Sequence, residues 1–160
     1  MHANEALVTR LYTALGKRDD VTMASCYHPD ARFHDIAFDL PDRRFRIKDM
    51  WRMICSRPIK VEIKSVEADD RTGRARIVDK YVFGGSDDPD DPGRPVTNEI
   101  ESRFEFRDGL ILVHQDFCDA KEWARLAVGG IGGFLGGRFR FLRSLKAKRL
   151  LAGFIRDNPE

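Results

Sequence analysis

The sequence predicts an α+β fold, in which a curved antiparallel β-sheet packs on three N-terminal helices and an extra helix follows at the C-terminus. The main observation is a change of hydrophobic period at Pro58, from the helical spacing of about 3.6 residues before it to strand alternation after it. A second observation is the composition. A chain of 160 residues with 42% hydrophobic and 34% charged residues is typical of one globular domain with a core.

Three helices and one strand are expected before Pro58. The first helix has one apolar face and ends at Gly16, where a C-terminal capping glycine belongs. Asp19 or Asp20 caps a short second helix, which ends before Pro29. The remaining elements of this part are a strand over residues 31–38 and a third helix over residues 47–54.

Four strands are expected after Pro58, joined as an antiparallel meander. In the third of them every second residue is polar, so this set should face water while the residues between them face a core. The sequence Arg107-Asp108-Gly109 indicates a hairpin turn before the last strand. The expected elements are strands at residues 61–66, 74–83, 97–106 and 110–118, an exposed loop at residues 84–93, and a closing helix that begins at Trp123.

Residues 1–128 are expected to form one domain, and residues 129–160 a Gly-rich connector with a basic amphipathic helix. Charge is distributed unevenly, because residues 1–120 carry a net charge of −4 and residues 121–160 a net charge of +6. We expect the apolar side of the C-terminal helix to cover the domain or a partner subunit while its basic side stays solvated. A membrane-surface contact is the alternative. A nucleic-acid partner is not expected, because the segment has charge but no base-reading motif.

Several function classes are excluded by features that the sequence lacks. No apolar run approaches the roughly 20 residues of a membrane-spanning helix, and no secretion signal is expected from the first residues. Three cysteines at unrelated spacings predict reduced thiols in a cytoplasmic protein. We expect no metal and no cofactor, because the sequence has no recognised metal-ligand spacing, G-x-S-x-G elbow or phosphate loop.

Two segments resemble the nuclear transport factor 2-like superfamily. Residues 27–35 (YHPDARFHD) are similar to its opening motif, and residues 106–119 (FRDGLILVHQDFCD) are similar to its closing hairpin. The resemblance covers residues 4–128 and implies a cone-shaped fold, which ketosteroid isomerase, limonene epoxide hydrolase, scytalone dehydratase and SnoaL-type polyketide cyclases share. The C-terminal tail resembles bacterial members of the SnoaL-like branch. We expect a homodimer that pairs through the sheet.

Only some of the catalytic residues of ketosteroid isomerase have counterparts at the matching positions of this sequence. Asp35 falls where that enzyme keeps its proton-shuttling aspartate. The acid of its oxyanion hole would fall at Ser102, which is a far weaker donor, and its tyrosine would fall near Leu11, one position from Tyr12. A steroid isomerase with the usual oxyanion hole is therefore not expected.

The resemblance to limonene epoxide hydrolase is also partial. Asp116 falls where that enzyme keeps one of its water-orienting aspartates. Asp79 can stand for the aspartate of its Arg-x-Asp strand, but Ile77 occupies the arginine position and Arg76 points to the opposite face. Epoxide hydrolysis by the complete triad is therefore not expected either.

The last strand carries the most informative pattern. Strand alternation places Leu110, Leu112, His114, Asp116 and Cys118 on one face, which the resemblance directs into the cone. A histidine and an aspartate two residues apart on such a face form a candidate pair for general acid/base catalysis. In the alternative interpretation, His114 caps a neighbouring carbonyl or lies at the wet mouth, and Asp116 is bound to an arginine.

Two further carboxylates are candidates. Asp79 shares a face with Tyr81 and with apolar neighbours, so burial should raise its pKa as a general base requires. Its alternative role is that of a buried hydrogen-bond partner of Tyr81, Asn98 or Ser102. The alternative for Asp35 is an exposed carboxylate in a turn near the rim.

The sequence therefore predicts a cofactor-independent acid/base enzyme of the isomerase, cyclase, dehydratase or hydrolase kind, with a small apolar ligand as substrate. The expected catalytic residues are Asp116, His114, Asp35 and Asp79. The expected substrate-contacting residues are Tyr81, Asn98, Ser102, Leu112, Tyr12 and Trp51. The alternatives are a non-catalytic ligand-binding or dimerisation domain, and membrane-surface association through the basic helix.

Overall fold

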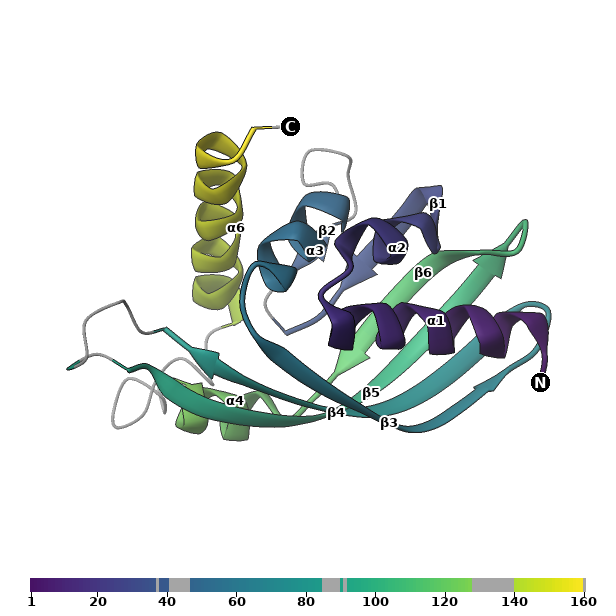
Figure 1. Ribbon diagram of the computed structural model, residues 1–160, viewed down its shortest axis with the longest axis horizontal. Helices are drawn as coiled ribbons and strands as arrows, with labels where there is room; N and C mark the ends of the chain where they lie inside the picture. The colour runs from purple at the N-terminus through teal and green to yellow at the C-terminus, as the bar shows by residue number, and fades with distance from the viewer. Residues whose placement is uncertain (37, 41–46, 85–89, 91, 128–139, 160) are drawn as a thin grey trace.

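The computed structural model describes residues 1–36, 38–40, 47–84, 90, 92–127 and 140–159 (Figure 1). Its helices are α1 (Ala3–Lys17), α2 (Asp20–Ser25), α3 (Ile47–Cys55), α4 (Ala120–Ala127) and α6 (Arg140–Asp157). Its strands are β1 (Tyr27–His34), β2 (Asp39–Leu40), β3 (Ile59–Ala68), β4 (Thr72–Phe83), β5 (Arg94–Arg107) and β6 (Leu110–Phe117).

The strands form one curved sheet in the order β2-β1-β6-β5-β4-β3. The four strands from β3 to β6 are the predicted antiparallel meander, and the three N-terminal helices lie on one side of the sheet (Figure 1). The predicted fold class is thus confirmed. One feature was not predicted: β1 pairs in parallel with β6, which places an N-terminal strand beside the last strand of the meander.

Helix α1 ends differently from the prediction. Gly16 lies inside the helix, and the left-handed capping position is occupied by Arg18, with φ of 61°. The Arg18 side chain offsets the cost of this conformation, because its Nε donates to the carbonyl of Cys55 at 2.7 Å and its Nη2 to that of Ser56 at 3.0 Å. The prediction for α2 is confirmed, since Asp19 accepts from the backbone N–H of Thr22 at 2.9 Å as its N-cap.

Strand β1 begins earlier than expected. The predicted strand covered residues 31–38, whereas β1 runs from Tyr27 to His34 and includes Pro29. The reason is its parallel partner, because Tyr27 is aligned with Ile111 and Phe33 with His114 on β6.

A register irregularity corrects the predicted face of β6. Glu105 on β5 is aligned with Val113, but the next residue, Phe106, is aligned with Ile111, so Leu112 is an extra residue in β6. Fully buried Ile111, rather than Leu110 or Leu112, therefore lies on the face of His114. His114 and Asp116 still share a face, as predicted.

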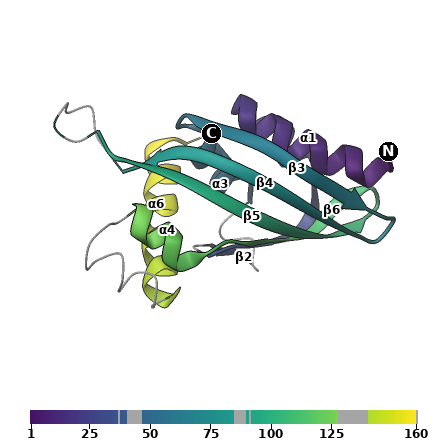
Figure 2. The same ribbon diagram turned by 90° about the horizontal axis from the view of Figure 1, so that it is seen from below.

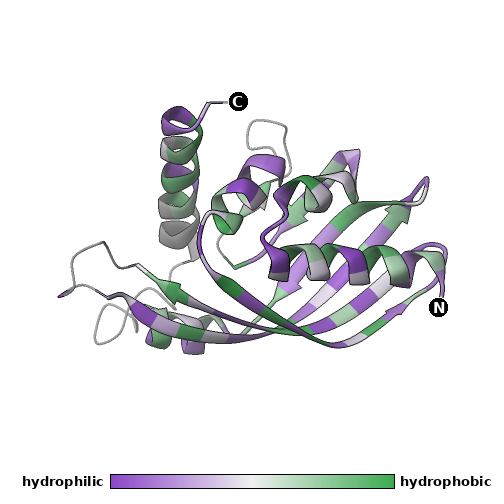
Figure 3. Ribbon diagram, viewed as in Figure 1, coloured by the Kyte–Doolittle hydropathy of each residue, from purple (hydrophilic) through white to green (hydrophobic). Residues whose placement is uncertain are grey.

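The core lies between the helices and the concave face of the sheet. Strands are coloured in alternating hydrophobic and hydrophilic bands in Figure 3, as expected for a sheet with one face buried. Fully or nearly fully buried side chains come from α1, α2, β1 and α3 as well as from the sheet, and include Leu11, Met23, Phe33, Met50 and Phe104.

Helix α6 packs on α3, and together with α4 it lies at the end of the sheet opposite the N-terminus (Figure 2). Leu151 is fully buried, and Arg52 of α3 lies over the ring of Phe154 and donates to the carbonyl of Asn158 at 3.0 Å. The apolar side of the helix therefore covers the domain, although Leu150 is exposed. The proposed boundary at residue 128 and the Gly-rich connector lie outside the described residues, as does most of the loop at residues 84–93.

No helix in the described part of the chain combines the length and the hydropathy needed to cross a membrane.

Candidate active site

Alternation along β4, β5 and β6 directs a set of polar side chains toward the concave, helix-covered face of the sheet, which we call the cup. Asp79 of β4 is aligned with Asn98 of β5, and Ser102 of β5 is aligned with Asp116 of β6. Asp79, Asn98, Ser102 and His114 are all buried. These residues separate into two groups. We call Tyr12, Tyr27, Ser102, His114 and Asp116 the His114 network, and we call Asp79, Tyr81, Asn98 and Trp123 the Tyr81 cluster.

The His114 network is joined by short hydrogen bonds around a fully buried imidazole. The Nδ1 atom of His114 is 2.7 Å from the hydroxyl of Tyr27, and its Nε2 atom is 2.8 Å from Oδ1 of Asp116. The hydroxyl of Ser102 lies 2.5 Å from the same carboxylate oxygen and 2.5 Å from the hydroxyl of Tyr12. The Tyr12 hydroxyl is also 3.3 Å from Nε2 of His114.

One assignment of protons satisfies these short contacts. An ionised Asp116 can only accept, so it receives hydrogen bonds from Ser102 Oγ–H and from His114 Nε2–H. With its proton on Nε2, His114 accepts from the Tyr27 hydroxyl at Nδ1, and Tyr12 donates to Ser102. Burial raises the pKa of both Tyr12 and Tyr27 well above the ordinary value, which keeps them as donors. In this assignment Asp116 accepts two hydrogen bonds, and His114 donates one and accepts one.

Aromatic rings enclose His114 on several sides. The ring centres of Phe104 and Phe33 lie 4.5 Å and 4.9 Å from that of the imidazole, and Trp51 stacks at 6.3 Å. Asp116 is more exposed than its partner: 13% of its side chain is exposed, whereas none of the His114 side chain is. His114 is thus enclosed by aromatic rings and bonded to Asp116.

The Tyr81 cluster lies where β4 and β5 meet α4. The indole Nε1 of Trp123 donates to the hydroxyl oxygen of Tyr81 at 2.7 Å, and Nδ2 of Asn98 donates to the same oxygen at 3.2 Å. Trp123 is held against β4 by an edge-to-face contact with Phe83 at 5.4 Å between ring centres. Burial raises the pKa of Tyr81 to about 12, so that its hydroxyl stays protonated.

Asp79 is a buried carboxyl group that forms no ion pair among the described residues. It is 7% exposed, and its Oδ1 atom accepts no hydrogen bond within the described chain. Burial raises the pKa of Asp79 to about 7, hydrogen bonds from Asn98 oppose the rise, and the charge of Asp116 adds to it. Ile77, two residues earlier on the same face, is buried and supplies no charge. Near neutral pH, Asp79 is therefore divided between its neutral and ionised forms.

Three other predicted site residues occupy the turn after β1, strand β6 and helix α3. Asp35 is in the turn after β1, where its carboxylate accepts a hydrogen bond from the backbone N–H of Phe38. Leu112 is the half-buried extra residue of β6. Trp51 lines the wall behind His114, and its indole Nε1 makes no hydrogen bond in the described part of the chain.

Two residues of these groups were not expected from the sequence. Tyr27 enters the His114 network only because β1 is parallel to β6, and a strand pairing of that kind leaves no local signal. Trp123 was expected only as the start of a helix. Its position six residues after the end of the last strand gives no reason to place it against Tyr81.

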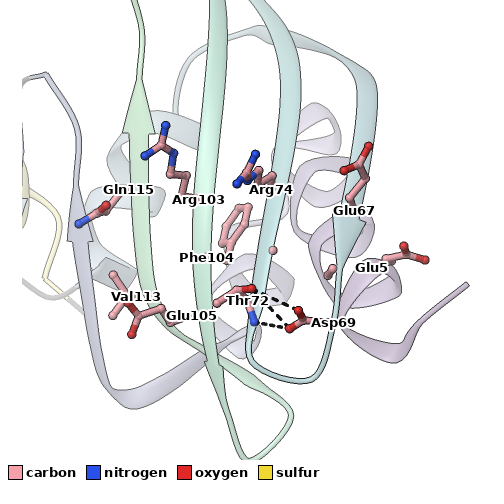
Figure 4. Close-up of a pocket in the computed structure, with 12 residues that line it drawn as sticks. Glu5, Glu67, Asp69, Thr72, Arg74, Arg103, Phe104, Glu105, Val113 and Gln115 are labelled. Atoms are coloured by element: carbon pink, nitrogen blue, oxygen red, sulfur yellow. Dashed lines mark hydrogen bonds between the residues drawn. The ribbon is translucent and has the colours of Figure 1, made fainter.

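A separate hollow of about 530 Å³ lies at the other end of the sheet, between α1, the β3–β4 turn, β5 and β6 (Figure 4). It is lined by Arg74 and Arg103, which are aligned on neighbouring strands, together with several carboxylates. Neither Asp79 nor Asp116 lines it. It is therefore distinct from the two groups described above.

Among the described residues, no cluster of three or more histidine, cysteine, aspartate or glutamate side chains is arranged to hold a metal ion.

Comparison with known proteins places this chain in a family. Residues 8–114, more than half of the chain, match the SnoaL-like domain. An LEH-like epoxide hydrolase from M. tuberculosis superposes with a TM-score of 0.62 at 19% identity, over 92% of this chain and 96% of that one. TsrD from Streptomyces laurentii gives a TM-score of 0.63 at 17% identity, over 80% and 96% of the two chains.

A protein from Catenulispora acidiphila with a ketosteroid isomerase-like fold gives a TM-score of 0.61 at 13% identity, over 76% and 92% of the two chains. No curated protein sequence gives a match. At these identities the structural likeness establishes the fold alone. The match over residues 8–114 shows that the chain belongs to the SnoaL-like domain family.

Proposed function

We propose that this protein is a cofactor-independent acid/base enzyme that acts on a small, mostly apolar substrate. The observation that carries the proposal is the contrast between two inward-facing carboxyl groups. Asp116 accepts two hydrogen bonds, whereas Asp79 is buried with one oxygen free of any described partner. Environments that separate the protonation states of two acids are the usual basis for assigning a base and an acid.

Asp116 is the proton acceptor in this proposal. Hydrogen bonds from Ser102 and His114 fix the orientation of its carboxyl group, and 13% of its side chain is exposed. Tyr27 keeps the imidazole in the tautomer that donates to Asp116.

Asp79 is the neutral partner and can donate a proton or a hydrogen bond. Its pKa of about 7 suits this role, because a group that titrates near the working pH can change state at low cost. The coupling between the two acids runs in the required direction, since the charge of Asp116 raises the pKa of Asp79.

The environment of Asp79 favours isomerase, cyclase or dehydratase chemistry over epoxide hydrolysis. The M. tuberculosis neighbour is an LEH-like epoxide hydrolase, and the Arg-x-Asp pattern of limonene epoxide hydrolase would place an arginine at position 77. Buried Ile77 cannot pair with Asp79 or keep it ionised.

Substitution of the two carboxyl groups tests this proposal. Both hydrogen bonds to Asp116 end on Oδ1, an atom that asparagine also has, so Asp116→Asn keeps the network while removing the base. The substrates are a β,γ-unsaturated cyclic ketone, a β-hydroxy ketone and a cyclic alkene epoxide, with products followed by mass spectrometry. We expect turnover of at least one, and a loss of about 100-fold in Asp116→Asn and Asp79→Asn.

The matched control is Glu99→Gln, which makes the same exchange on the exposed face of β5 beside Asn98 and should leave turnover unchanged. The proposal is wrong if none of the three substrates reacts, or if both aspartate variants turn over as fast as the wild-type protein.

We also propose that the outer face of the sheet pairs two copies of the chain. Phe117 and Val82 on that face are 43% and 48% exposed, and strand alternation places them opposite the cup. Sedimentation velocity should give a dimer for the wild-type protein and a monomer for Phe117→Glu. A monomeric wild-type protein would contradict the proposal.

A further inference from the structure

Helix α6 carries most of the positive charge of the C-terminal segment. It contains six basic residues and one acidic residue, Asp157, which gives the helix a net charge of +5. Five of the six lie within its first ten residues, where the sequence has no acidic side chain. The basic residues are Arg140, Arg143, Lys146, Lys148, Arg149 and Arg156. The helix is therefore a concentrated positive charge at one end of the molecule (Figure 2).

The packing of α6 on α3 does not neutralise this charge. Helix α3 carries two basic residues, Lys48 and Arg52, against one acidic residue, Asp49, so its own net charge is positive. The single acid of α6, Asp157, is paired with Arg156 at 2.9 Å. Neither helix therefore offers an excess of negative charge to the remaining basic residues of α6.

An exposed stripe runs along the outer side of α6. Its members follow one another at spacings of three or four residues, so they lie on one line along the helix. We call it the outer stripe, and all of its residues are exposed: Leu145, Arg149, Ala152 and Arg156. Ala147 and Leu151 are buried and lie on the opposite side of the helix. Arg149 makes no hydrogen bond or ion pair with any described residue.

Leucine side chains accompany the exposed arginines. Leu145 is 39% and Leu150 is 57% exposed, and Leu145 lies one turn before Arg149 while Leu150 follows it directly. Exposed leucine side chains gain free energy when they enter an apolar phase, and arginine side chains beside them suit anionic headgroups. Basic residues with neighbouring exposed leucines are typical of a helix that lies on a membrane surface.

The helix is already folded and fixed by contacts on its other side. Leu151 is fully buried, and Arg52 of α3 lies 5.8 Å from the ring centre of Phe154. Because these contacts do not use the outer stripe, a partner can approach the stripe without displacing them. Binding would then not incur the entropic cost of ordering a helix.

We propose that α6 binds the surface of an anionic lipid bilayer through the outer stripe, with Leu145 and Leu150 entering the headgroup region. The basic side chains pair with lipid phosphates, and the helix lies on the bilayer without crossing it. A nucleic acid would use the charge but not the leucines, which is why a membrane fits this face better. The inference is independent of the proposed acid/base function. It places the protein where small apolar molecules concentrate.

Sedimentation with lipid vesicles tests the inference on the full chain. The vesicles are phosphatidylcholine alone, or phosphatidylcholine mixed with an equal amount of phosphatidylglycerol. We expect binding to the mixed vesicles only, and weaker binding at higher salt because counterions screen the charges. Arg149→Gln should bind about fivefold more weakly, as the loss of one charge at an anionic surface implies. Leu150→Ser should lose a similar factor, because its side chain no longer enters the headgroup region.

Matched control variants make the same exchanges away from α6. Arg71→Gln removes an exposed arginine in the turn between β3 and β4, and Val21→Ser removes an apolar side chain of α2 that is 74% exposed. Neither should change vesicle binding. Point substitutions are preferred to deletion of α6, because deletion would uncover the surface that buries Leu151. All four side chains are exposed, so thermal unfolding of each variant should match that of the wild-type protein.

A tryptophan in place of Leu150 reports insertion directly. The emission of Leu150→Trp, after subtraction of the wild-type signal, should shift to shorter wavelength with the mixed vesicles. It should also be quenched when the phosphatidylcholine is brominated on its acyl chains. Val21→Trp is the matched control and should show neither change.

The possible outcomes separate a membrane from other partners. Absence of binding to the mixed vesicles at low salt overturns the inference, and so does equal binding to both kinds of vesicle. Wild-type affinity in both Arg149→Gln and Leu150→Ser overturns it as well. A helix that serves nucleic acid would bind duplex DNA at the same phosphate concentration, equally well in Leu150→Ser, so DNA binding without vesicle binding also overturns it. None of these outcomes affects the acid/base proposal, which is tested by turnover.

Discussion

The His114 network and the Tyr81 cluster are built from similar residues and differ in how completely their hydrogen bonds are used. In the network, the imidazole and the Asp116 carboxylate have partners at 2.8 Å or less. In the cluster, one carboxylate oxygen and one phenolic hydrogen remain without a described partner. A satisfied buried network stabilises the fold, whereas an unsatisfied one costs stability and is expected where a ligand completes it.

The largest effect that tests this comparison is the pH dependence of stability at Asp79. Its pKa of about 7 in the folded protein is above the ordinary value of 3.8, so the folded state binds the proton more tightly than the unfolded state. Stability should therefore fall as the pH rises from about 4 to about 7, by up to ~4 kcal/mol, and then level off.

Asp79→Asn should remove this slope and make the protein more stable than the wild type above neutral pH. Urea unfolding across the pH range measures it, with Glu99→Gln as the exposed control that keeps the slope. An unchanged slope in Asp79→Asn would show that Asp79 has a partner that keeps it ionised.

A loss of about 3 kcal/mol is expected for His114→Ala. The substitution empties the space between Phe33 and Phe104 and leaves the hydroxyl of Tyr27 without its acceptor. Urea unfolding at neutral pH gives the value. Val21→Ala truncates a side chain that is 74% exposed and should change the free energy of unfolding by less than ~1 kcal/mol. Equal losses in the two variants would contradict the view that the network stabilises the fold.

Ser102→Ala should cost about 1–2 kcal/mol, because Tyr12 loses its acceptor and Asp116 loses one of two donors. The exposed Ser65 on β3 offers a matched substitution, and Ser65→Ala should change the free energy of unfolding by less than ~0.5 kcal/mol. If Ser102→Ala is as stable as the wild type, the short contacts at Ser102 contribute nothing to folding.

The smallest effect is expected for Trp123→Phe, at about 1 kcal/mol, since the phenyl ring keeps the contact with Phe83 and only the hydrogen bond to Tyr81 is lost. The chain has two tryptophans, so this variant leaves Trp51 as the single reporter of the His114 network. Its fluorescence should change little as the pH passes through 7. A large change there would mean that the two groups titrate as one unit.

Much of the fold could be predicted from periodicity, because apolar and polar residues alternate along any strand that has one face buried. Alternation also placed His114 with Asp116 and Asp79 with Tyr81 on shared faces, as the register has them. Contacts between segments that are far apart in the sequence could not be predicted. The parallel pairing that brings Tyr27 to His114 has no signal in the sequence, and neither does the extra residue Leu112 that moves Ile111 inward.

The parallel pairing of β1 with β6 also bears on the order in which the molecule folds. Hairpins of the meander join neighbours in sequence, whereas the bonds of Tyr27 and Tyr12 to His114 close separations of 87 and 102 residues. Closing such long loops is entropically costly and slow compared with local pairing. The His114 network therefore assembles only after the meander exists. A partly folded chain would have the contacts of Asp116 with Ser102 and His114 within the β5–β6 hairpin but not those of Tyr12 and Tyr27, and substitutions of the two tyrosines should slow the final folding step more than the first ones.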